Sequence, residues 1–353
     1  MQGTLSTILV VRLSSVGDIV LATPLLRSLR RRFPAARIDF LVKAEYAPLL
    51  AASPDVDRVL PFPGWGPASL LGLRRSVRAA RYDLIVDIHD SLRSRVLTFA
   101  APGVVRYRKR RLPRFVLVHF KRDLYRWFGG APGVAERYLE AVRPLGAVGD
   151  GLGPEIRYAA TAASRAAGVL GDAGVEPGVA ALGVCPSARH FTKRWPADRF
   201  AAAAAEIAGE RGWPVLLFGS ADERDYAEAI ARDVRSRQPR STVVNLAGSL
   251  SLDETAAAMD RCALVLCNDT GLMHIAAARR RPVVAVFGCT TRQLGFFPAG
   301  TAAEVVENDG LPCRPCTHIG RAACPEGHFL CMRGIPVERV TAAARRLVPA
   351  PTR

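Results

Sequence analysis

An acidic residue, Asp18, stands where an apolar strand is expected to turn into a helix. Residues 8–11 (ILVV) predict a strand buried on both faces, and apolar residues then recur at helical spacing from Ile19 to Leu29. In open α/β sheets, ligands bind at the carboxyl ends of strands, because the loops there meet helix amino-termini with unpaired N–H groups. Gly17 and Asp18 are therefore candidate site residues. The alternative is that Asp18 only caps the helix.

A second segment of this kind follows a strand expected to end at Cys267. There, Asp269, Thr270 and Gly271 precede a predicted helix. Gly271 allows close approach of a ligand, Thr270 adds a hydroxyl, and the helix dipole favours a diphosphate by up to about 2 kcal/mol. His274 lies one turn further on the same face. The alternatives are a helix capped by Asp269 and a His274 that only packs.

Both segments belong to an alternation of strands and helices that predicts parallel sheets covered by helices. A Gly-rich stretch at residues 145–154 interrupts this alternation, which then resumes. We therefore expect two Rossmann-like domains, residues 1–155 and 156–353, facing each other across a cleft between the carboxyl edges of their sheets. The expected strands lie at 8–12, 38–42, 57–62, 84–88 and 103–106, and then at 179–185, 214–219, 242–246, 263–268 and 282–288.

The charge of the chain is strongly positive and unevenly distributed. The net charge is +17, and residues 1–155 carry 25 Lys and Arg against 13 Asp and Glu. The densest run, residues 106–127, holds nine basic residues and one acid among aromatic residues. An acidic partner is therefore expected on the first half, and a nucleic acid, an anionic membrane surface or a phosphorylated glycolipid would each suit it.

The lengths of the apolar runs and the positions of the cysteines indicate where the protein is located and whether its cysteines are reduced. No stretch reaches the ~18–20 uncharged apolar residues that span a bilayer, and no secretory signal is recognisable, so we expect a cytoplasmic protein. Eight cysteines are present, and reduced cysteine in an apolar strand behaves as a small hydrophobe. We expect this of the four that lie in or beside predicted strands, namely Cys185, Cys262, Cys267 and Cys289.

The order of several short motifs resembles glycosyltransferase family 9, the ADP-heptose:lipopolysaccharide heptosyltransferases. The motifs are R-x-x-x-x-G-D ending at Asp18, IVDIHDSLRSR with Arg93 and Ser94, SARHFTKRWPADRF, FGSADERDYAE and N-D-T-G-L-M-H ending at His274. The resemblance covers nearly the whole chain. It implies the GT-B fold and an inverting transfer of heptose from ADP-heptose to the lipopolysaccharide inner core or a related glycan, without a catalytic metal or other cofactor.

The same resemblance assigns roles to single residues. Asp18 matches the general base, and Lys193 matches the cation that stabilises the departing diphosphate. The N-terminal domain is expected to bind the acceptor, with Ser14, Ser15, Gly17 and Arg93 near it or near the phosphates. The C-terminal domain is expected to bind the donor, and its last helix to pack back on the N-terminal domain. The expected donor-binding residues are Thr192, Glu223, Asp269, Thr270, Gly271, Leu272 and His274.

A late group of cysteines, Cys313, Cys316, Cys324 and Cys331, has the first C-x-x-C of a zinc ribbon but lacks the second. Similar cysteines occur in relatives, so a structural role is expected. A bound structural metal, a disulfide and free thiols all remain open at this point.

The resemblance also implies partners and leaves two rival functions. The expected partners are ADP-heptose, an anionic glycolipid acceptor and, by peripheral contact, the inner face of the cytoplasmic membrane, with the protein a monomer. Residues 289–300 depart from the Pro-Thr-x-Pro turn of relatives, so a transferase or epimerase using another nucleotide-sugar is one rival. The other is a nucleic-acid-binding protein, for which no helix-turn-helix, zinc-finger, RRM or KH signature is found.

Overall fold

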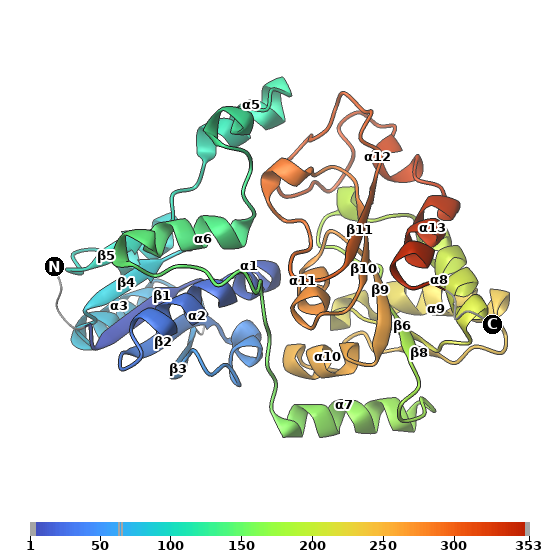
Figure 1. The fold of residues 1–353 in the computed structure, drawn as a ribbon, viewed down its shortest axis with the longest axis horizontal. Helices are drawn as coiled ribbons and strands as arrows, with labels where there is room; N and C mark the ends of the chain where they lie inside the picture. Colours follow the sequence, from blue (N-terminus) through green and yellow to red (C-terminus); the bar gives the residue numbers. More distant parts are fainter. Residues whose placement is uncertain (1–4, 63, 65, 350–353) are drawn as a thin grey trace. The chain divides into compact units, whose positions relative to one another are not determined.

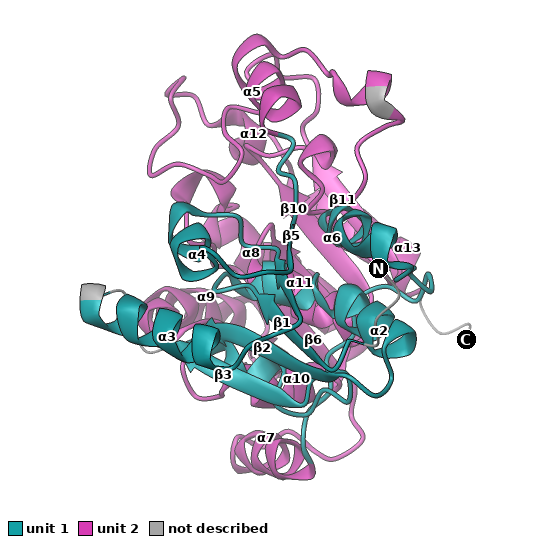
Figure 2. Cartoon of the chain, turned by 90° about the vertical axis from the view of Figure 1, so that its left-hand side faces the viewer, with its two compact units in different colours: residues 1–110, 134–159 teal, residues 111–133, 160–353 magenta. Residues whose placement is uncertain are grey.

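The chain forms two compact α/β units, described here from a computed structural model. The structure describes residues 5–349 except 63 and 65. The first unit comprises residues 1–110 and 134–159, and the second comprises residues 111–133 and 160–353 (Figure 2). Both have a parallel sheet with helices, as the alternation of the sequence predicts (Figure 1).

Within the described residues, the first unit has a five-stranded parallel sheet in the order β3-β2-β1-β4-β5. The central β1 pairs with β2 and β4, and its residues from Ile8 to Val11 are fully buried. This confirms the strand predicted there. The strands are β1 (Thr7–Val11), β2 (Arg37–Lys43), β3 (Arg58–Phe62), β4 (Leu84–Asp87) and β5 (Val104–Arg106).

The helical pattern after β1 is divided into two helices. The short α1 (Val16–Val20) ends before α2 (Thr23–Arg32), and Pro24 lies in the first turn of α2. Proline fits a first turn because that position needs no backbone N–H, whereas inside one continuous helix it would break a hydrogen bond. The other helices of this unit are α3 (Pro67–Ala79), α4 (Leu92–Leu97) and α6 (Val134–Val142), with short 3-10 turns η1 (Ala44–Leu49) and η3 (Arg143–Leu145).

The described part of the second unit has a six-stranded parallel sheet in the order β11-β10-β9-β6-β7-β8. The strands are β6 (Ala181–Cys185), β7 (Val215–Leu217), β8 (Val243–Asn245), β9 (Cys262–Asn268), β10 (Val283–Phe287) and β11 (Ala303–Glu307). Strand β11 was not predicted from the sequence. Its sequence, AEVVE, carries two glutamates, which an edge strand tolerates because one side faces water.

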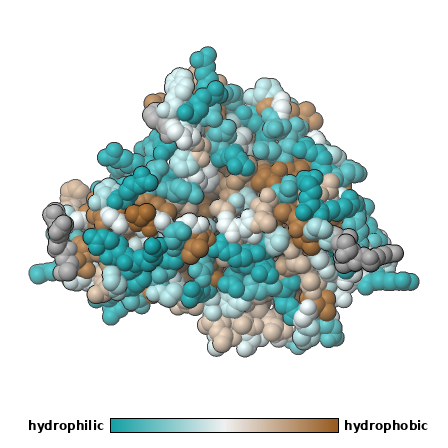
Figure 3. All heavy atoms as spheres, viewed as in Figure 1, coloured by the Kyte–Doolittle hydropathy of each residue, from teal (hydrophilic) through white to brown (hydrophobic). Residues whose placement is uncertain are grey.

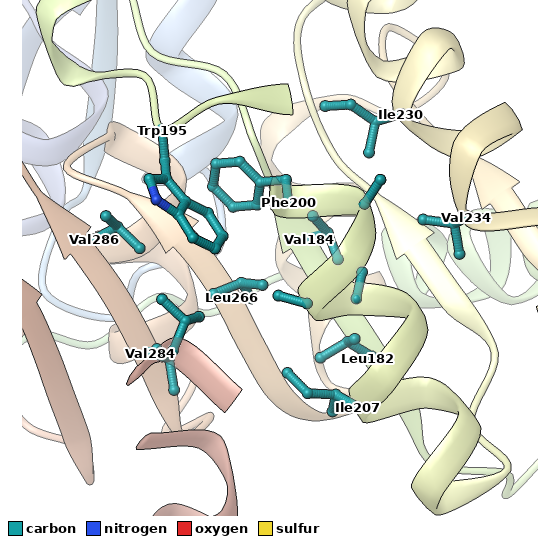
Figure 4. Packing of buried hydrophobic residues seen from close by; sticks show 14 of the residues in the cluster. Leu182, Val184, Trp195, Phe200, Ile207, Ile230, Val234, Leu266, Val284 and Val286 are labelled. Carbon is teal, nitrogen blue, oxygen red and sulfur yellow. The ribbon is translucent and has the colours of Figure 1, made fainter. Parts of the chain in front are cut away.

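The core of the second unit lies between this sheet and helix α8 (Ala197–Arg211). Figure 4 shows Trp195 and Phe200 packed beside Val184, Leu266 and neighbouring aliphatic side chains. Trp195 is fully buried, and its indole N–H donates to the carbonyl of Ile335 at 3.1 Å. The remaining helices are α5 (Arg111–Phe120), α7 (Ala160–Asp172), α9 (Arg224–Arg237), α10 (Leu252–Met259), α11 (Gly271–Ala278), α12 (Leu330–Arg333) and α13 (Val337–Leu347). Four 3-10 turns accompany them: η2 (Tyr125–Phe128), η4 (Phe191–Lys193), η5 (Ala221–Glu223) and η6 (Arg292–Leu294).

The last helix, α13, packs against α8, β10 and β11 within the second unit. The expected contact of this helix with the N-terminal domain stays a prediction. Val340 is buried there, and the Arg345 guanidinium pairs with Glu206 and Glu210 of α8.

Residues 111–133 also differ from the expected division of the chain, because they group with the second unit (Figure 2). Tyr125 and Leu117 are buried against Leu294. The Lys121 ammonium donates to the carbonyl of Pro315 at 2.7 Å. These contacts join residues far apart in sequence, and no local pattern encodes them.

Each sheet reverses its strand order at one point. In the first unit the reversal lies between β1 and β4, and in the second it lies between β6 and β9. At such a point the connections leave in opposite directions, so the loops part and leave room for a ligand at the carboxyl edge. Asp18 follows β1 and Asp269 follows β9, so both lie where ligands of such sheets bind.

An ion pair between Arg27 and Asp150 fixes the segment through which the chain leaves the first unit. We expect this pair to make the stability of the unit depend on pH. Arg27 of α2 binds Asp150 through two hydrogen bonds, of 2.5 and 2.7 Å, and the carboxylate is only 14% exposed. These bonds hold the pKa of Asp150 well below its usual range. Because the folded pKa is the lower one, the stabilisation is present above about pH 4 and is lost as the pH falls.

We therefore expect Asp150→Asn to lower the free energy of unfolding of the first unit by about 1–3 kcal/mol at pH 7. The deficit relative to wild type should shrink below about pH 4. Denaturant titrations at several pH values measure this, with the exposed Glu136→Gln as the control. A deficit that is constant with pH would mean that the charge of Asp150 contributes nothing.

Candidate functional site

Asp18 is held by a dense set of hydrogen-bond donors. The Arg12 guanidinium lies 2.6 Å from Oδ2, which also accepts from the hydroxyl of Ser15 at 2.9 Å and from its backbone N–H at 3.3 Å. The hydroxyl of Tyr138 donates to the other oxygen, Oδ1, at 3.1 Å. Arg12 is fixed in turn, because its Nη1 donates to the carbonyl of Ile88 at 2.8 Å.

This set holds Asp18 as a carboxylate. Burial alone would raise the pKa of Asp18, but the charge and hydrogen bond of Arg12 and the bonds from Ser15 lower it below its usual value. Burial, with the adjacent Asp18 charge, raises the pKa of Tyr138 well above 10, so its hydroxyl keeps its proton. Asp18 therefore contributes to a helix cap and also carries a charge near the end of β1. The cap and the functional interpretation are compatible.

A group of cations that was not predicted from the sequence lies near His89, after β4. His89 is largely enclosed, and burial together with the charges of Arg12 and Lys109 lowers its pKa to about 4. The Lys109 ammonium donates to the carbonyls of His89 and Asp90 at 2.7 and 2.8 Å. The signal was present in the sequence, because His89 lies in the IVDIHDSLRSR motif one residue after the end of a predicted strand.

The other predicted residues of the first unit lie at this edge with unequal roles. Ser14 is partly exposed and Gly17 is buried. Arg93 of α4 is exposed and is close enough to His89 to lower the pKa of that ring. Ser94 is buried and its hydroxyl accepts from the backbone N–H of Ser91, so it caps α4.

In the second unit, the structure brings two predicted residues into contact. The Lys193 ammonium lies 2.7 Å from Oδ2 of Asp269, and the carboxylate is nearly buried. The hydroxyl of Thr290 donates to the same oxygen at 2.7 Å. Lys193 lies in η4, after β6, and Asp269 follows β9, so the pair forms at the point where the strand order reverses.

Helix α11 begins beside this pair. Thr270, rather than Asp269, is its N-cap residue, and the side chain of Thr270 makes no capping hydrogen bond. Gly271 and Leu272 in the first turn are partly exposed. His274 is buried, with its ring centroid 6.4 Å from that of Phe296. The first turn of α11 can thus meet a ligand, while His274 packs in the interior.

Thr192 has a structural contact that the motif did not reveal. It is buried, and its hydroxyl accepts from the backbone N–H of Arg321 at 2.8 Å. Its own backbone N–H donates to the carbonyl of Arg321 at 3.2 Å. Thr192 therefore fixes the loop that carries Lys193.

Glu223 follows β7, the next strand along the same edge. One carboxylate oxygen, Oε2, accepts from the backbone N–H of Ser220 at 3.0 Å, which forms a helix cap. Glu223 is partly exposed, so the cap leaves part of the carboxylate open to a ligand.

Asn268, in the same motif as Asp269, was not singled out from the sequence. Its side-chain amide is buried, accepts from the backbone N–H of Trp195 at 3.0 Å and donates to the carbonyl of Pro186 at 2.6 Å. It thereby connects the end of β9 to the loop after β6, which contains Lys193.

The cysteine-rich segment supports the same loops. Arg314 is buried and donates to the carbonyls of Gly288 and Thr290 at 2.6 and 2.9 Å. It therefore fixes the backbone of the residue whose hydroxyl contacts Asp269. All eight cysteines are free thiols. No group of three or more His, Cys, Asp or Glu side chains in the described part of the chain is arranged to hold a metal ion.

The four cysteines predicted to be core residues are buried, as expected. Burial raises the pKa of Cys262 to about 12 and that of Cys185 well above its usual value. These thiols therefore stay protonated at neutral pH.

Comparison with protein families gives one match that covers most of the chain. Residues 70–325 match the model of "Glycosyltransferase family 9 (heptosyltransferase)". The chain is also similar to lipopolysaccharide heptosyltransferase 2 of Escherichia coli K12, with 32% identity over 295 residues, 80% of this chain and 82% of that protein.

Solved structures agree with this match. A family 9 glycosyltransferase from Veillonella parvula superimposes with a TM-score of 0.81 at 23% identity over 98% of both chains. The E. coli ADP-heptose lipopolysaccharide heptosyltransferase II gives a TM-score of 0.73 at 26% identity over 97% of this chain and 98% of that one. The predicted class, GT-B with two Rossmann-like domains, is confirmed.

The enclosed position of His89 makes a prediction that NMR can check. An unfolded histidine titrates near pH 6.5, and this one should titrate near pH 4 in the folded protein. Because the pKa of His89 is lower in the folded protein, protonation of this ring favours the unfolded state. The stabilisation that neutral His89 gives is fully present above about pH 6.5 and is lost as the pH falls toward 4. His89→Gln removes the resonance and so confirms its assignment. A midpoint above pH 6 would show that the ring is solvated.

Proposed function

Because the chain belongs to glycosyltransferase family 9, we propose that this glycosyltransferase moves a heptose from ADP-heptose to the lipopolysaccharide inner core or a related glycan, inverting the sugar carbon. The observation that carries the proposal is the 32% identity with a lipopolysaccharide heptosyltransferase over 80% of the chain. The placement of Asp18, Lys193 and Asp269 at the strand-order reversals supports it.

The donor would bind to the second unit. Its diphosphate would lie at the first turn of α11, where backbone N–H groups and the helix dipole favour negative charge. Lys193 would follow the charge that grows on the departing ADP, and Asp269 would hold the ammonium in place until then. Glu223 would accept hydroxyl hydrogens of the ribose.

The acceptor would bind to the first unit, with Asp18 as the general base. A carboxylate with a lowered pKa is too weak a base to deprotonate a free hydroxyl. The hydroxyl becomes acidic only as its oxygen forms the bond to the anomeric carbon. We therefore propose that Asp18 takes the proton during attack, while the bond from that carbon to the diphosphate oxygen breaks on the opposite face.

The cations around Asp18 suit an anionic acceptor. Arg12, Lys109 and Arg93 lie close enough to His89 to lower its pKa, and a phosphate or carboxylate beside the reacting hydroxyl would be attracted to them. Ser14 and Ser15 would contribute polar contacts. No metal ion or other cofactor is needed in this scheme, because Lys193 and the helix dipole offset the charge of the leaving group.

The location we propose is the cytoplasmic face of the inner membrane, with the protein a monomer held by peripheral contact. None of the described helices has the length and apolar composition needed to cross a membrane. The basic residues of the first half would attract an anionic surface, since each contributes about 1 kcal/mol within a Debye length. No specific nucleic acid is part of this proposal.

Asp18→Asn should lower kcat by about 10²–10⁴ while changing the affinity for ADP by no more than a few-fold. The amide keeps the shape of the side chain but cannot accept a proton. Asp18 belongs to the first unit, whereas the proposed donor residues belong to the second. Steady-state kinetics and ADP titration measure the two effects. Near-normal kcat in the variant would exclude Asp18 as the base.

Lys193→Ala should lower kcat and also reduce the thermal stabilisation that ADP gives, because the cation meets diphosphate charge in both the ground state and the transition state. A nucleotide screen by thermal shift on wild type should first show selective stabilisation by ADP. If the variant changed only the KM for the acceptor, Lys193 would belong to the other substrate.

A further inference from the structure

A buried hydrogen bond connects Asp18 to a distant part of the first unit. The hydroxyl of Tyr138, on α6, donates to Oδ1 of Asp18 at 3.1 Å. Helix α6 follows residues 111–133 and packs against α2 and β5. The surface drawn in Figure 3 mixes hydrophilic and hydrophobic side chains, whereas Tyr138 is only 1% exposed. A buried tyrosine hydroxyl needs a partner, and here that partner is the proposed base.

The two oxygens of Asp18 have unequal surroundings. Oδ2 lies 2.6 Å from the Arg12 guanidinium and accepts from the hydroxyl and the backbone N–H of Ser15 at 2.9 and 3.3 Å. Among the described residues, Tyr138 alone donates a hydrogen bond to Oδ1. A carboxylate has about four lone-pair sites on its two oxygens. The contacts of Oδ2 occupy its sites, while Tyr138 leaves one site of Oδ1 for a further donor.

The Arg12 guanidinium also makes the two oxygens unequal as bases. A positive charge or a hydrogen-bond donor stabilises the charged form of the oxygen that it contacts. A proton on Oδ2 would therefore oppose the guanidinium, whereas a proton on Oδ1 leaves the 2.6 Å contact of Oδ2 in place. Oδ1 is thus the more basic oxygen as well as the one with an open site.

We propose that Oδ1 of Asp18 takes the acceptor proton, and that Tyr138 is a positioning residue that fixes the orientation of this oxygen. The inference deepens the proposed function and rests on it. As the acceptor oxygen bonds to the anomeric carbon, its proton moves to Oδ1 and the O–H electron pair stays on the acceptor oxygen. The bond from the anomeric carbon to the diphosphate oxygen breaks, and its electron pair leaves with ADP.

Tyr138 is suited to this role because it keeps both its proton and its place. Burial and the Asp18 charge raise the pKa of its hydroxyl well above 10, so it remains a donor at neutral pH. The ring of Tyr107 meets the Tyr138 ring edge-on, with centroids 5.1 Å apart. The Arg12 guanidinium lies 5.8 Å from the Tyr138 centroid. These two contacts hold the ring that carries the hydroxyl.

The other titratable groups nearby do not replace this contact. The charged and titratable side chains on the elements around Asp18 are Arg12 after β1, His89 after β4, Tyr107 after β5, Tyr138 on α6, and Lys43, Glu45 and Tyr46 at η1. Lys43 and Glu45 pair with each other at 3.4 Å. His89 is neutral at neutral pH, because its pKa is lowered to about 4.

The test compares Tyr138→Phe with a matched control, Tyr82→Phe. Tyr82 is also buried in the first unit, and its hydroxyl donates to Asp39 of β2 at 2.6 Å. Both variants therefore lose one buried hydrogen bond from a tyrosine to a carboxylate. Tyr138→Phe should lower kcat about tenfold and change the affinity for ADP by less than about twofold. Tyr82→Phe should keep the kcat of wild type, and an unchanged kcat in Tyr138→Phe would overturn the proposal.

The pH dependence separates positioning of the base from a purely structural role. Loss of the Tyr138 donor should raise the pKa of Asp18 by about 0.5–1 pH unit, because that donor favours the charged form. The base is then protonated at a higher pH. The kcat/KM of Tyr138→Phe, divided by that of Tyr82→Phe, should fall about twofold between about pH 6 and pH 4.

Two further points make this comparison decisive. His89 titrates near pH 4 in both variants, so its effect cancels in the ratio. Circular dichroism at each pH shows whether both variants remain folded. A ratio that does not change with pH would mean that Tyr138 has only a structural role, and the proposal would then be wrong.

Carbon-13 NMR of the aspartate carboxyls measures the pKa of Asp18 without any reaction, and Asp18→Asn assigns its resonance. We expect a higher midpoint in Tyr138→Phe than in Tyr82→Phe. If the two midpoints were equal, Tyr138 would not act on Oδ1 and the proposal would fail. If the midpoint rose but wild type transferred no heptose, the proposed function would fail while the bond between Tyr138 and Asp18 would stand.

Discussion

Asp18 remains a carboxylate inside the first unit because the Arg12 guanidinium lies 2.6 Å away and compensates its charge. Removing one partner of such a pair leaves an unpaired charge in a poorly solvated place, so the two residues are required together. The second unit repeats the arrangement with Lys193 and Asp269, 2.7 Å apart. Each pair follows a strand at which the strand order reverses, where a ligand can reach it. The pairs hold these charged side chains in fixed positions.

The residues behind these pairs hold them through backbone groups. Thr192 and Asn268 each bond to the backbone of a loop distant in sequence, and Arg314 fixes the carbonyl of Thr290. The cysteine-rich segment thus has a structural role in holding these loops. Its Arg314 and Arg321 position the residues around Lys193, so substitutions far from the proposed donor site in sequence can disturb that site.

Most of the fold was predictable because it is encoded locally. The apolar runs of β1 and β9 and the turns after them appear directly in the sequence, and they identify Asp18 and Asp269. Contacts between distant residues were not predictable in the same way. The hydroxyl of Thr192 bonds to Arg321, and residues 111–133 pack with Leu294, without any local signal. His89 was missed because its motif resembles an ordinary strand end, and only the fold shows the cations around it.

The central claim is that this chain transfers heptose with inversion. Incubation of the purified protein with ADP-heptose and a lipopolysaccharide core acceptor, followed by mass spectrometry and NMR of the product, tests it most directly. We expect an acceptor heavier by one heptose residue, release of one ADP for each product, and an anomeric configuration opposite to that of the donor. A product that retains the donor configuration, or an altered nucleotide-sugar with no glycosylated acceptor, would contradict it.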